Sequence, residues 1–485
     1  MGRPLHSMIP QSPQRFASMP ALRRQRFTVT RLIETAKAFR QTMLSRRPLG
    51  NLAPFRLRQC LALDSFMASG TSRTFRRVLF LRLKRETQAD ICSRGSGEGA
   101  VAHGRGKQNQ PIPGALAADD RTAEASLQAV ILVGGEGTRL RPLTYGTPKP
   151  MVPLFGVPFL ERTIVRLRDA GVDEVILAAG YLPQAIMDHF GDGSKVGLRV
   201  TYVLEEAPLG TAGALRNVAD RLTGAFFVLN GDVLTSLDLR AMLAFHESKG
   251  GEGVIHAIRV DDPSAFGCLV HDASGRISRF VEKPPRAQAP TDEINAGTYL
   301  LEPSVLARIP CGRSVSIERE TFPDLLAAGG RLYAYTTEDY WLDVGRPEQY
   351  VQAHGDVLDG KLILPPAGRT SGGTMFVAST LQVPPNVQPP VFVGEGVEID
   401  PTAIVGPYVV VGDNCRIGAG AHVRNSIVWD GVAIEAGAVV TEAILASNVR
   451  VGNGAIVSAG AVIGHDARVP AGQVLDPGAR VRAHD

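Results

Sequence analysis

From residue 127 onward, apolar runs of strand length alternate with segments whose apolar residues recur at helical spacing. QAVILVGG, at 128–135, is typical of a buried strand, and PFLERTIVRLRDAG, at 158–171, predicts an amphipathic helix that ends at glycine. The alternation continues with predicted strands at 173–180, 198–206 and 226–232 and predicted helices at 182–193 and 211–222. This order indicates βαβ units and a mostly parallel sheet with helices on both faces.

A different repeat occupies the end of the chain, where aliphatic residues recur every six positions with two five-residue steps. The first part of the series is Val393, Ile399, Val405, Val411, Ile417 and Val423, closed by Trp429. The second part is Ile434, Val440, Leu445, Val451, Val457, Ile463, Val469, Leu475 and Val481. Repeats this short cannot bury an apolar face alone, so they stack into a parallel β-helix. The hexapeptide period predicts a left-handed β-helix of about five coils.

These patterns divide the chain into four expected parts. Residues 1–126 form a basic extension, 127–360 an α/β domain, 361–390 a Pro/Gly-rich linker and 391–485 the β-helix. The first 125 residues contain 22 Lys and Arg against 8 Asp and Glu and show no sustained apolar period. This composition favours a disordered extension or an over-long gene model. A transit peptide and a nucleic-acid-binding arm are the alternatives.

Composition narrows the class of protein. Hydrophobic residues make up 44% of the chain and charged residues 21%, the balance of a globular protein with a large core. No run approaches 18 apolar residues, so we expect no membrane insertion. The five cysteines are scattered without a CxxC pair, which argues against a disulfide framework or a cysteine zinc site and favours the cytoplasm. Outside the extension, 40 acidic residues exceed 30 basic ones, so we expect no nucleic-acid partner.

The loop after the first predicted strand carries the most specific chemistry. In AVILVGGEGTRLRPLTYGTPKP, at 129–150, glycines at an expected helix start leave backbone N–H groups accessible to an anion. The loop matches neither the Walker motif nor the dinucleotide fingerprint. Prolines on both sides restrict the backbone of Lys149, so its ammonium is held in place. With Arg139 it supplies two fixed cations for the charge that develops in phosphoryl transfer.

This stretch resembles a family signature. GGEGTRLRPLTYGTPKP is similar to GGxGTRLxPLTxxxPKP of the sugar-nucleotide pyrophosphorylases, nucleotidyltransferases that join a nucleoside triphosphate to a sugar 1-phosphate. Six further matches follow in order: EEAPLGTAGAL, FFVLNGDV, FVEKP, INAGTYLL, SIERETFP and YWLDVGRPEQY. The resemblance implies a Rossmann-like nucleotidyltransferase domain followed by a left-handed β-helix. It is strongest to members that use GTP and mannose 1-phosphate and form GDP-mannose.

The resemblance also implies roles for individual residues. The expected catalytic cations are Arg139, Lys149 and Lys283. The expected nucleotide contacts are Leu132, Gly134, Gly135, Gly137, Thr138, Arg139, Lys149, Glu205, Glu206 and Gly210. The expected sugar-phosphate contacts are Asn230, Gly231, Gly267, Glu282, Lys283 and Asn295. Asp232 and Asp343 are expected to hold Mg²⁺, which prefers carboxylate and phosphate oxygens.

The implied reaction is a direct displacement by the phosphate of the sugar 1-phosphate on the α-phosphorus of the triphosphate. This nucleophile is already an anion at neutral pH, so no general base is required. Guanine presents two adjacent N–H donors, and a carboxylate can accept both of them. This match favours GTP, with Glu205 or Glu206 at a strand end as the reader of the base.

Three alternatives stay open at this point. The first is thymidylyl, uridylyl or adenylyl transfer to glucose 1-phosphate. The second is a bifunctional acyltransferase that uses His422 or His465 as a base, and the third is a regulatory homologue that binds sugar nucleotides without turnover. We expect the β-helix to drive assembly into a homo-oligomer and to take no part in the chemistry.

Overall fold

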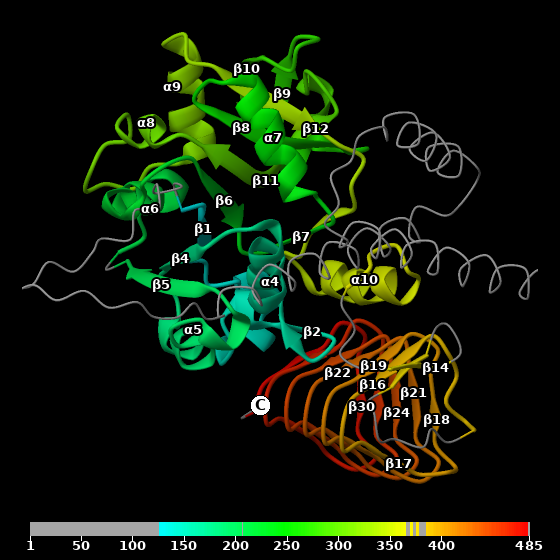
Figure 1. Cartoon of the computed structure of the whole chain (residues 1–485). Coiled ribbons are helices and arrows are strands. Elements are labelled where there is room, and N and C mark those ends of the chain that lie inside the picture. The colour runs from blue at the N-terminus through cyan, green and yellow to red at the C-terminus, as the bar shows by residue number, and fades with distance from the viewer. Residues whose placement is uncertain (1–125, 206, 365–368, 372–374, 378–384, 484–485) are drawn as a thin grey trace, which may run out of the picture. The chain divides into compact units, whose positions relative to one another are not determined.

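The computed structural model describes residues 126–205, 207–364, 369–371, 375–377 and 385–483. These residues belong to one compact unit, Ala117–Asp485, which contains an α/β domain and a stack of short strands (Figure 1). Among the helices of the described residues, none is both long and apolar enough to cross a membrane. The predictions made for residues 1–125 lie outside this part of the chain.

A nine-stranded sheet forms the centre of the α/β domain. Its first half is entirely parallel, in the order β6-β1-β4-β5. These strands match the expected ones: β1 (Gln128–Val133), β4 (Glu174–Ala179), β5 (Arg199–Leu204) and β6 (Phe226–Asn230). The second half is mainly antiparallel and consists of β8 (Gly253–Arg259), β9 (Gly267–His271), β10 (Ile277–Glu282), β11 (Glu293–Leu301) and β12 (Leu332–Thr336). Because β1 pairs directly with β6, the GGEGTR and NGD sequences leave the sheet side by side.

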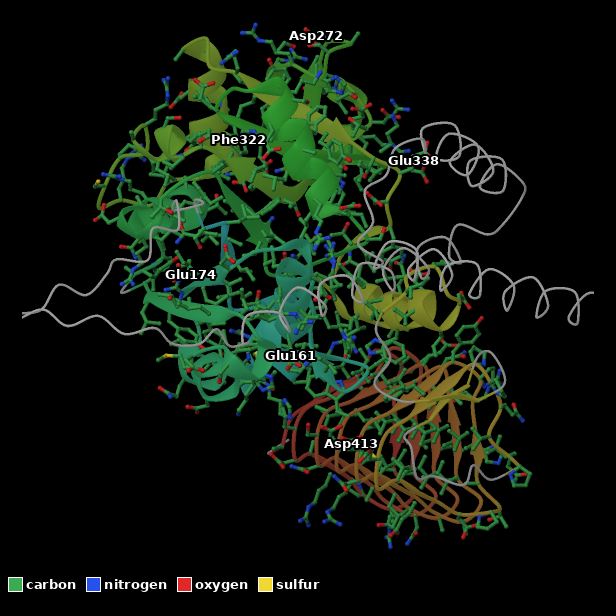
Figure 2. The ribbon with its side chains drawn as sticks, viewed as in Figure 1. Glu161, Glu174, Asp272, Phe322, Glu338 and Asp413 are labelled. Carbon is green, nitrogen blue, oxygen red and sulfur yellow. The ribbon has the colours of Figure 1, made fainter. Side chains whose placement is uncertain are left out.

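Helices cover both faces of this sheet because successive residues of each strand point to opposite faces. Ala129 and Ile131 of β1 pack on the face covered by α4 (Phe159–Ala170), α5 (Pro183–Phe190) and α7 (Leu239–Lys249). Val130 packs on the opposite face, which α6 (Gly210–Asn217) and α9 (Phe322–Ala327) cover. Phe322, at the start of α9, meets Tyr299 of β11 edge to face, with ring centroids 5.3 Å apart (Figure 2). Two further α-helices of the described residues are α8 (Pro303–Leu306) and α10 (Pro347–Leu358).

The C-terminal strands form three parallel sheets around one aliphatic core, consistent with a left-handed β-helix of hexapeptide repeats. The first sheet contains β16 (Val391–Val393), β19 (Val409–Val411), β22 (Ile427–Val428), β25 (Ile444–Leu445), β28 (Val462–Ile463) and β31 (Arg480–Val481). The second contains β17 (Glu398–Ile399), β20 (Arg416–Ile417), β23 (Ala433–Ile434), β26 (Arg450–Val451) and β29 (Arg468–Val469). The third contains β18 (Ile404–Val405), β21 (His422–Arg424), β24 (Val439–Thr441), β27 (Ile456–Val457) and β30 (Val474–Leu475).

The aliphatic series predicted from the sequence is wrong by one residue at its first interruption. Val411 pairs with Val428, and Val428 lies in the interior column of the β-helix core. The five-residue step therefore lies between Val423 and Val428. A shift of one residue along a strand moves a side chain to the opposite face. Trp429 accordingly lies outside the β-helix core and packs with Tyr350 of α10.

Two strands lie within the segment expected to be a linker, 361–390. β14 (Arg369–Ser371) pairs antiparallel with β15 (Met375–Val377), and β15 pairs in parallel with β16. The first sheet of the β-helix therefore extends to β15, before the boundary expected at residue 391. This pairing covers the open edge of β16, which an abrupt start at residue 391 would have left unpaired.

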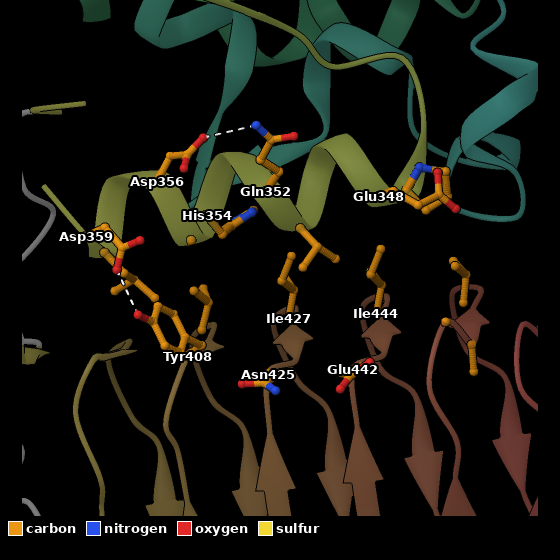
Figure 3. A pocket seen from close by; sticks show the side chains of 18 residues that line it. Glu348, Gln352, His354, Asp356, Asp359, Tyr408, Asn425, Ile427, Glu442 and Ile444 are labelled. Carbon is orange, nitrogen blue, oxygen red and sulfur yellow. Dashed lines mark hydrogen bonds between the residues drawn. The ribbon is translucent and has the colours of Figure 1, made fainter. Parts of the chain in front are cut away.

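A groove of about 500 Å³ lies between α10 and the β-helix (Figure 3). Outward side chains of the first sheet, including Ile427 and Ile444, give it an apolar floor. Glu348, Asp359 and Glu442 contribute acidic groups to its lining. Of the described residues that line this groove, none is among those expected to bind substrate. The groove is therefore separate from the phosphate loop.

Candidate active site

The loop after β1 presents backbone N–H groups at the carboxyl edge of the sheet. Within the described residues, the amides of Gly135, Glu136 and Gly137 donate no backbone–backbone hydrogen bond. Gly137 has a φ of 63°, and a Cβ there would lie 2.8 Å from the Cβ of Lys149, so only glycine fits. The helix expected after the loop is a three-residue 3₁₀-helix, Thr138–Leu140. The loop can therefore bind an anion through these amides and not through the dipole of a long helix.

Lys149 is held by an acidic partner from the neighbouring strand connection. It begins the 3₁₀-helix Lys149–Met151, and its Nζ lies 2.6 Å from Oδ2 of Asp232. The Lys149 side chain is 12% exposed and that of Asp232 is 33% exposed, so the pair borders solvent on one side. The ion pair joins the PKP sequence to the NGD sequence.

Asp343 lies beside this ion pair because a small sheet brings it there. β13 (Trp341–Asp343) pairs antiparallel with β7 (Val233–Thr235), and the amide of Val344 donates to the carbonyl oxygen of Asp232 at 3.0 Å. Burial and the Asp232 carboxylate raise the pKa of Asp343 above its ordinary value. Three nearby cations oppose this increase, namely Lys149, Arg139 and Lys283. Two carboxylates and three cations therefore act on one another in this region.

Arg139 reaches the same region from the loop. A Cβ on Gly345 would lie 2.8 Å from Nη2 of Arg139, so the guanidinium group rests directly on the Gly345 backbone. Gly345 is the second residue after Asp343 in the sequence LDVGR. A larger residue at position 345 would displace the guanidinium group from this place.

The EKP motif lies at the end of β10, beside a glycine that leaves space. Glu282 pairs with Gly267 of β9, and a Cβ at Gly267 would lie 2.9 Å from Oε2 of Glu282. The Nζ of Lys283 lies 3.3 Å from Oε1 of the same carboxylate. Burial raises the pKa of Glu282, and Lys283 opposes this increase. The motif thus places a carboxylate and a cation next to each other beside Gly267.

Two asparagines expected at the sugar phosphate approach the same glycine. Asn295 donates from Nδ2 to the Tyr299 hydroxyl at 2.8 Å, and its Oδ1 accepts from the Gly297 amide at 2.9 Å. A Cβ on Gly297 would lie 2.7 Å from Nδ2 of Asn230. Asn295 retains one N–H and one lone pair for a ligand, because an amide side chain offers two of each. Gly231 donates its amide to the carbonyl oxygen of Leu132, at 3.1 Å.

Glu205 lies beside the first glycine of the loop. A Cβ on Gly134 would lie 3.7 Å from Oε1 of Glu205, and Oε2 accepts from the Leu209 amide at 3.2 Å. Gly180, which follows β4, was not identified from the sequence, although a Cβ there would lie 3.1 Å from the carbonyl oxygen of Gly134. Glu206, the other candidate reader of the base, lies outside the described residues.

The SIERETFP segment contributes a residue that sequence reasoning missed. Oε2 of Glu318 accepts from the hydroxyl groups of Thr211 at 2.9 Å and Ser316 at 2.7 Å. Gly210 has a φ of 69°, and a Cβ there would lie 2.6 Å from the carbonyl oxygen of Val315. The backbone of the expected nucleotide-binding segment PLGTAG therefore packs against Val315, the residue that precedes SIERETFP. The family match of SIERETFP is the signal that could have identified Glu318.

Trp341 is a second residue that the sequence did not single out. Its Nε1 donates to the carbonyl oxygen of Ala296 at 2.8 Å, and its ring meets Phe266 edge to face at 5.3 Å. Ala296 follows Asn295, and Phe266 precedes Gly267, so the indole joins the two strands that carry these expected sugar contacts. An isolated tryptophan shows no periodic pattern that would separate this role from core packing.

The carboxylates fit a divalent cation that also binds substrate phosphate. Among the described residues, no group of three or more His, Cys, Asp and Glu side chains could enclose a metal ion. Asp232 and Asp343 repel each other, as the raised pKa of Asp343 indicates, and a dication would relieve this repulsion. A hard cation of this kind needs only one or two protein carboxylates when phosphates and water complete its coordination.

The two histidines of the acyltransferase alternative have different surroundings. His422 is exposed on β21. His465 contacts the α/β domain, because its Nε2 lies 3.0 Å from Oγ1 of Thr147 and 3.2 Å from the Leu143 carbonyl oxygen. Neither ring forms a hydrogen bond with a carboxylate of the described residues, as a catalytic base usually does.

Comparison with known proteins identifies the family. Residues 128–360 match the nucleotidyl transferase family, and residues 387–482 match the GMPPB C-terminal domain. The chain is 43% identical over 321 residues to a mannose-1-phosphate guanylyltransferase of Mycobacterium tuberculosis, covering 66% of this chain and 84% of the relative. It is 38% identical over 349 residues to mannose-1-phosphate guanylyltransferase 1 of Arabidopsis thaliana, covering 71% and 92%. A crystal structure of HddC from Yersinia pseudotuberculosis is 34% identical, with a TM-score of 0.41, over 47% of this chain and 97% of that one. The chain therefore belongs to the mannose-1-phosphate guanylyltransferase family of nucleotidyl transferases.

Proposed function

We propose that the chain joins GTP to mannose 1-phosphate and forms GDP-mannose and pyrophosphate. The observation that carries this proposal is the convergence of Arg139, Lys149, Asp232 and Asp343 at the loop after β1. The names of the relatives from Mycobacterium tuberculosis and Arabidopsis thaliana support guanylyl transfer and mannose 1-phosphate.

The proposed reaction forms one P–O bond and breaks another. A phosphate oxygen of mannose 1-phosphate attacks the α-phosphorus of GTP, and the bond from this phosphorus to the bridging oxygen breaks. Pyrophosphate leaves with the electron pair, and no proton has to be removed from the nucleophile. Arg139 and Lys149 are proposed to stabilise the charge on the leaving pyrophosphate, and Lys283 to orient the attacking phosphate.

We propose Mg²⁺ as the divalent cation, held by Asp232 and Asp343. When bound, it would supply neutralising charge to the phosphates. The chain also holds this cation in place, because the 2.6 Å ion pair fixes Lys149 against Asp232. The ammonium group therefore loses little side-chain freedom when the triphosphate binds.

Glu205 supports GTP as the nucleotide. Its carboxylate lies beside Gly134 and is oriented by the Leu209 amide, so it is fixed next to the phosphate loop. A carboxylate accepts both donors on the guanine edge, whereas uracil and thymine present acceptors on both sides of one donor. Transfer of a thymidylyl, uridylyl or adenylyl group to glucose 1-phosphate is the alternative that the assay below distinguishes.

We also propose that the chain forms a homo-oligomer through the β-helix. Within the described residues, β29, β30 and β31 have no strand beyond them, so the last coil has open edges. Light scattering should give a mass above the 51.8 kDa of one chain, and removal of residues 385–485 should lower the number of subunits. A monomer mass for the full chain would contradict this part of the proposal.

The test of the proposed function is an initial-rate assay of pyrophosphate release. GTP, ATP, UTP and dTTP are each combined with mannose 1-phosphate and with glucose 1-phosphate, in the presence of MgCl₂. We expect GTP with mannose 1-phosphate to give the highest kcat/KM, and Arg139→Ala to abolish most of it. A higher kcat/KM for another pair would contradict the assignment of substrates, and no release with any pair would contradict the proposed reaction.

A further inference from the structure

The last coils of the β-helix contact the segment that joins the phosphate loop to Lys149. Besides the contacts of His465 with Thr147 and Leu143, the neighbouring Gly464 lies so close to Pro142 that a Cβ there would be 3.1 Å from the proline Cβ. The Tyr145 ring is likewise contacted by Arg482, whose guanidinium carbon lies 4.6 Å from the ring centroid. These contacts place the β-helix against the piece of chain that carries the proposed phosphate cations.

The contacted segment is itself bonded to the loop. Thr144 is fully buried, and its hydroxyl donates to the carbonyl oxygen of Gly137 at 2.9 Å. Gly137 also packs on Lys149, with no room for a Cβ between them. The backbone held by His465 at Leu143 is therefore one residue from Thr144, and Thr147 is two residues from Lys149. A displacement at either point would move a group that we propose to bind phosphate.

His465 is in turn held by Trp429, which is itself hydrogen-bonded to α10. Its ring meets Trp429 at a centroid distance of 5.3 Å, and Trp429 Nε1 donates to the Tyr350 hydroxyl at 3.0 Å. Tyr350 donates to the carbonyl oxygen of Pro153. Burial lowers the pKa of His465, while the Leu143 carbonyl group and Asp466 oppose this decrease. A carbonyl oxygen only accepts, so the contact with Leu143 requires a hydrogen on Nε2.

We propose that His465 is a positioning residue for nucleotidyl transfer, which holds the Leu143–Thr147 segment so that Lys149 and the phosphate loop keep their relative positions. The β-helix thereby takes part in catalysis, contrary to the expectation that it serves assembly alone. This inference rests on the proposed function. A misplacement of about 1 Å at a reacting centre can cost about 10²-fold in rate, so a partial loss of this contact has a measurable effect.

The test compares four single variants and the double variant His465→Leu/Thr147→Val in steady-state kinetics. His465→Leu removes the contacts with Thr147 and Leu143, and His465→Gln keeps an N–H donor. Thr147→Val removes the hydroxyl group that contacts His465. His422→Leu is the matched control, because it makes the same change on an exposed strand of the same β-helix. We expect kcat of His465→Leu to fall about tenfold and the KM for mannose 1-phosphate to stay unchanged, because Glu282 and Lys283 lie on another element.

We expect His465→Gln to recover most of this kcat and His422→Leu to equal the wild type. Thr147→Val should add no further loss to His465→Leu, since both remove the same contact. An unchanged kcat in His465→Leu would overturn the proposal. Equal losses of kcat in His465→Leu and His465→Gln would also overturn the proposal. The same holds if the double variant loses the sum of the two single losses.

A second readout separates positioning from activity. Hydrogen exchange of the substrate-free protein should be faster over residues 141–149 in His465→Leu than in the wild type and in His422→Leu, at the same melting temperature. Unchanged exchange over this segment, or a general rise across the β-helix, would overturn the positioning role. If the wild type releases no pyrophosphate with any substrate pair, the proposed function fails, but hydrogen exchange still decides whether His465 holds this segment.

Discussion

The Nζ atom of Lys149 lies 2.6 Å from Oδ2 of Asp232, so the cation of the PKP sequence is paired with the carboxylate of the NGD sequence. The two residues are 83 positions apart, and they meet because the strands that lead to them, β1 and β6, are neighbours. This pair connects the two halves of the proposed site, one for phosphate and one for metal. Each half can therefore be tested through one member of the pair.

Loss of the Lys149 cation should lower the rate of transfer without unfolding the chain. We expect Lys149→Met to reduce kcat/KM for GTP by about 10²–10³-fold, as is usual when one donor to transition-state charge is removed. Initial rates of pyrophosphate release measure the effect. The matched control is Lys195→Met, which removes an exposed lysine of a surface 3₁₀-helix and should leave the rate unchanged. Equal rates in both variants would exclude Lys149 from the reaction.

Asp232 and Asp343 should control the response to metal. We expect Asp343→Asn and Asp232→Asn each to lower kcat by at least about 10²-fold and to raise the metal concentration needed for half-maximal rate. Titration with MgCl₂ and MnCl₂ tests this, with Mn²⁺ giving partial recovery. Asp188→Asn, at an exposed helix position, is the control. If both variants keep the wild-type dependence on metal, these carboxylates are not the ligands.

Glu205 should discriminate GTP from ITP, because ITP lacks the N2 amine whose hydrogen bond the carboxylate is proposed to accept. We expect Glu205→Gln to reduce the ratio of kcat/KM for GTP over ITP by about tenfold, the effect of losing about 1.4 kcal/mol of interaction. The same ratio in Glu205→Gln and the wild type would show that Glu205 does not read the base. Glu206→Gln is then the next variant to measure.

Much of the fold could be predicted because its causes are local in sequence. The strands β1, β4, β5 and β6 follow from apolar runs bounded by glycine or polar residues, and the β-helix follows from its hexapeptide period. The face on which Trp429 lies could not be predicted, because Val428 and Trp429 are both apolar and the five-residue step can be placed before either of them. Only the pairing of Val411 with Val428 decides this register.

The charged residues of the candidate site could also be named from the sequence, because the family motifs contain them. The residues that hold these charged side chains in place could not be identified from the sequence. Gly345 contacts Arg139 across 206 positions, and Trp341 reaches Ala296 only because β13 pairs with β7. His465 carries no motif, and its contact with Thr147 spans 318 positions. Such contacts depend on how elements that are distant in sequence pack together. The periodicity of apolar residues along the chain carries no information about this packing.

Stability should fall in mild acid because a buried histidine is kept neutral. Burial lowers the pKa of His354 from 6.5 to about 4. Between these two values the unfolded chain binds more protons than the folded chain, so the free energy of unfolding decreases as the pH falls from about 6.5 to about 4. His256 changes in the same direction, since burial lowers its pKa to about 4 as well.

Urea unfolding at several pH values between 7 and 4 measures this dependence. His354→Gln cannot titrate, so we expect the free energy of unfolding to change less with pH in this variant than in the wild type, whatever its absolute stability. His189→Gln, at an exposed position that pairs with Glu161, is the control. An equal pH dependence in His354→Gln and the wild type would contradict the buried neutral state.

Transfer of a guanylyl group from GTP to a hexose 1-phosphate can be measured in a competition reaction. GTP, ATP, UTP and dTTP are supplied together at equal concentration with equal mannose 1-phosphate and glucose 1-phosphate, and the products formed before a tenth of the substrate is consumed are identified by mass spectrometry. We predict GDP-mannose as the main product with one pyrophosphate released per molecule, and no product with Lys149→Met. A different nucleotide sugar as the main product, or GDP-mannose formed equally by Lys149→Met, would contradict the account.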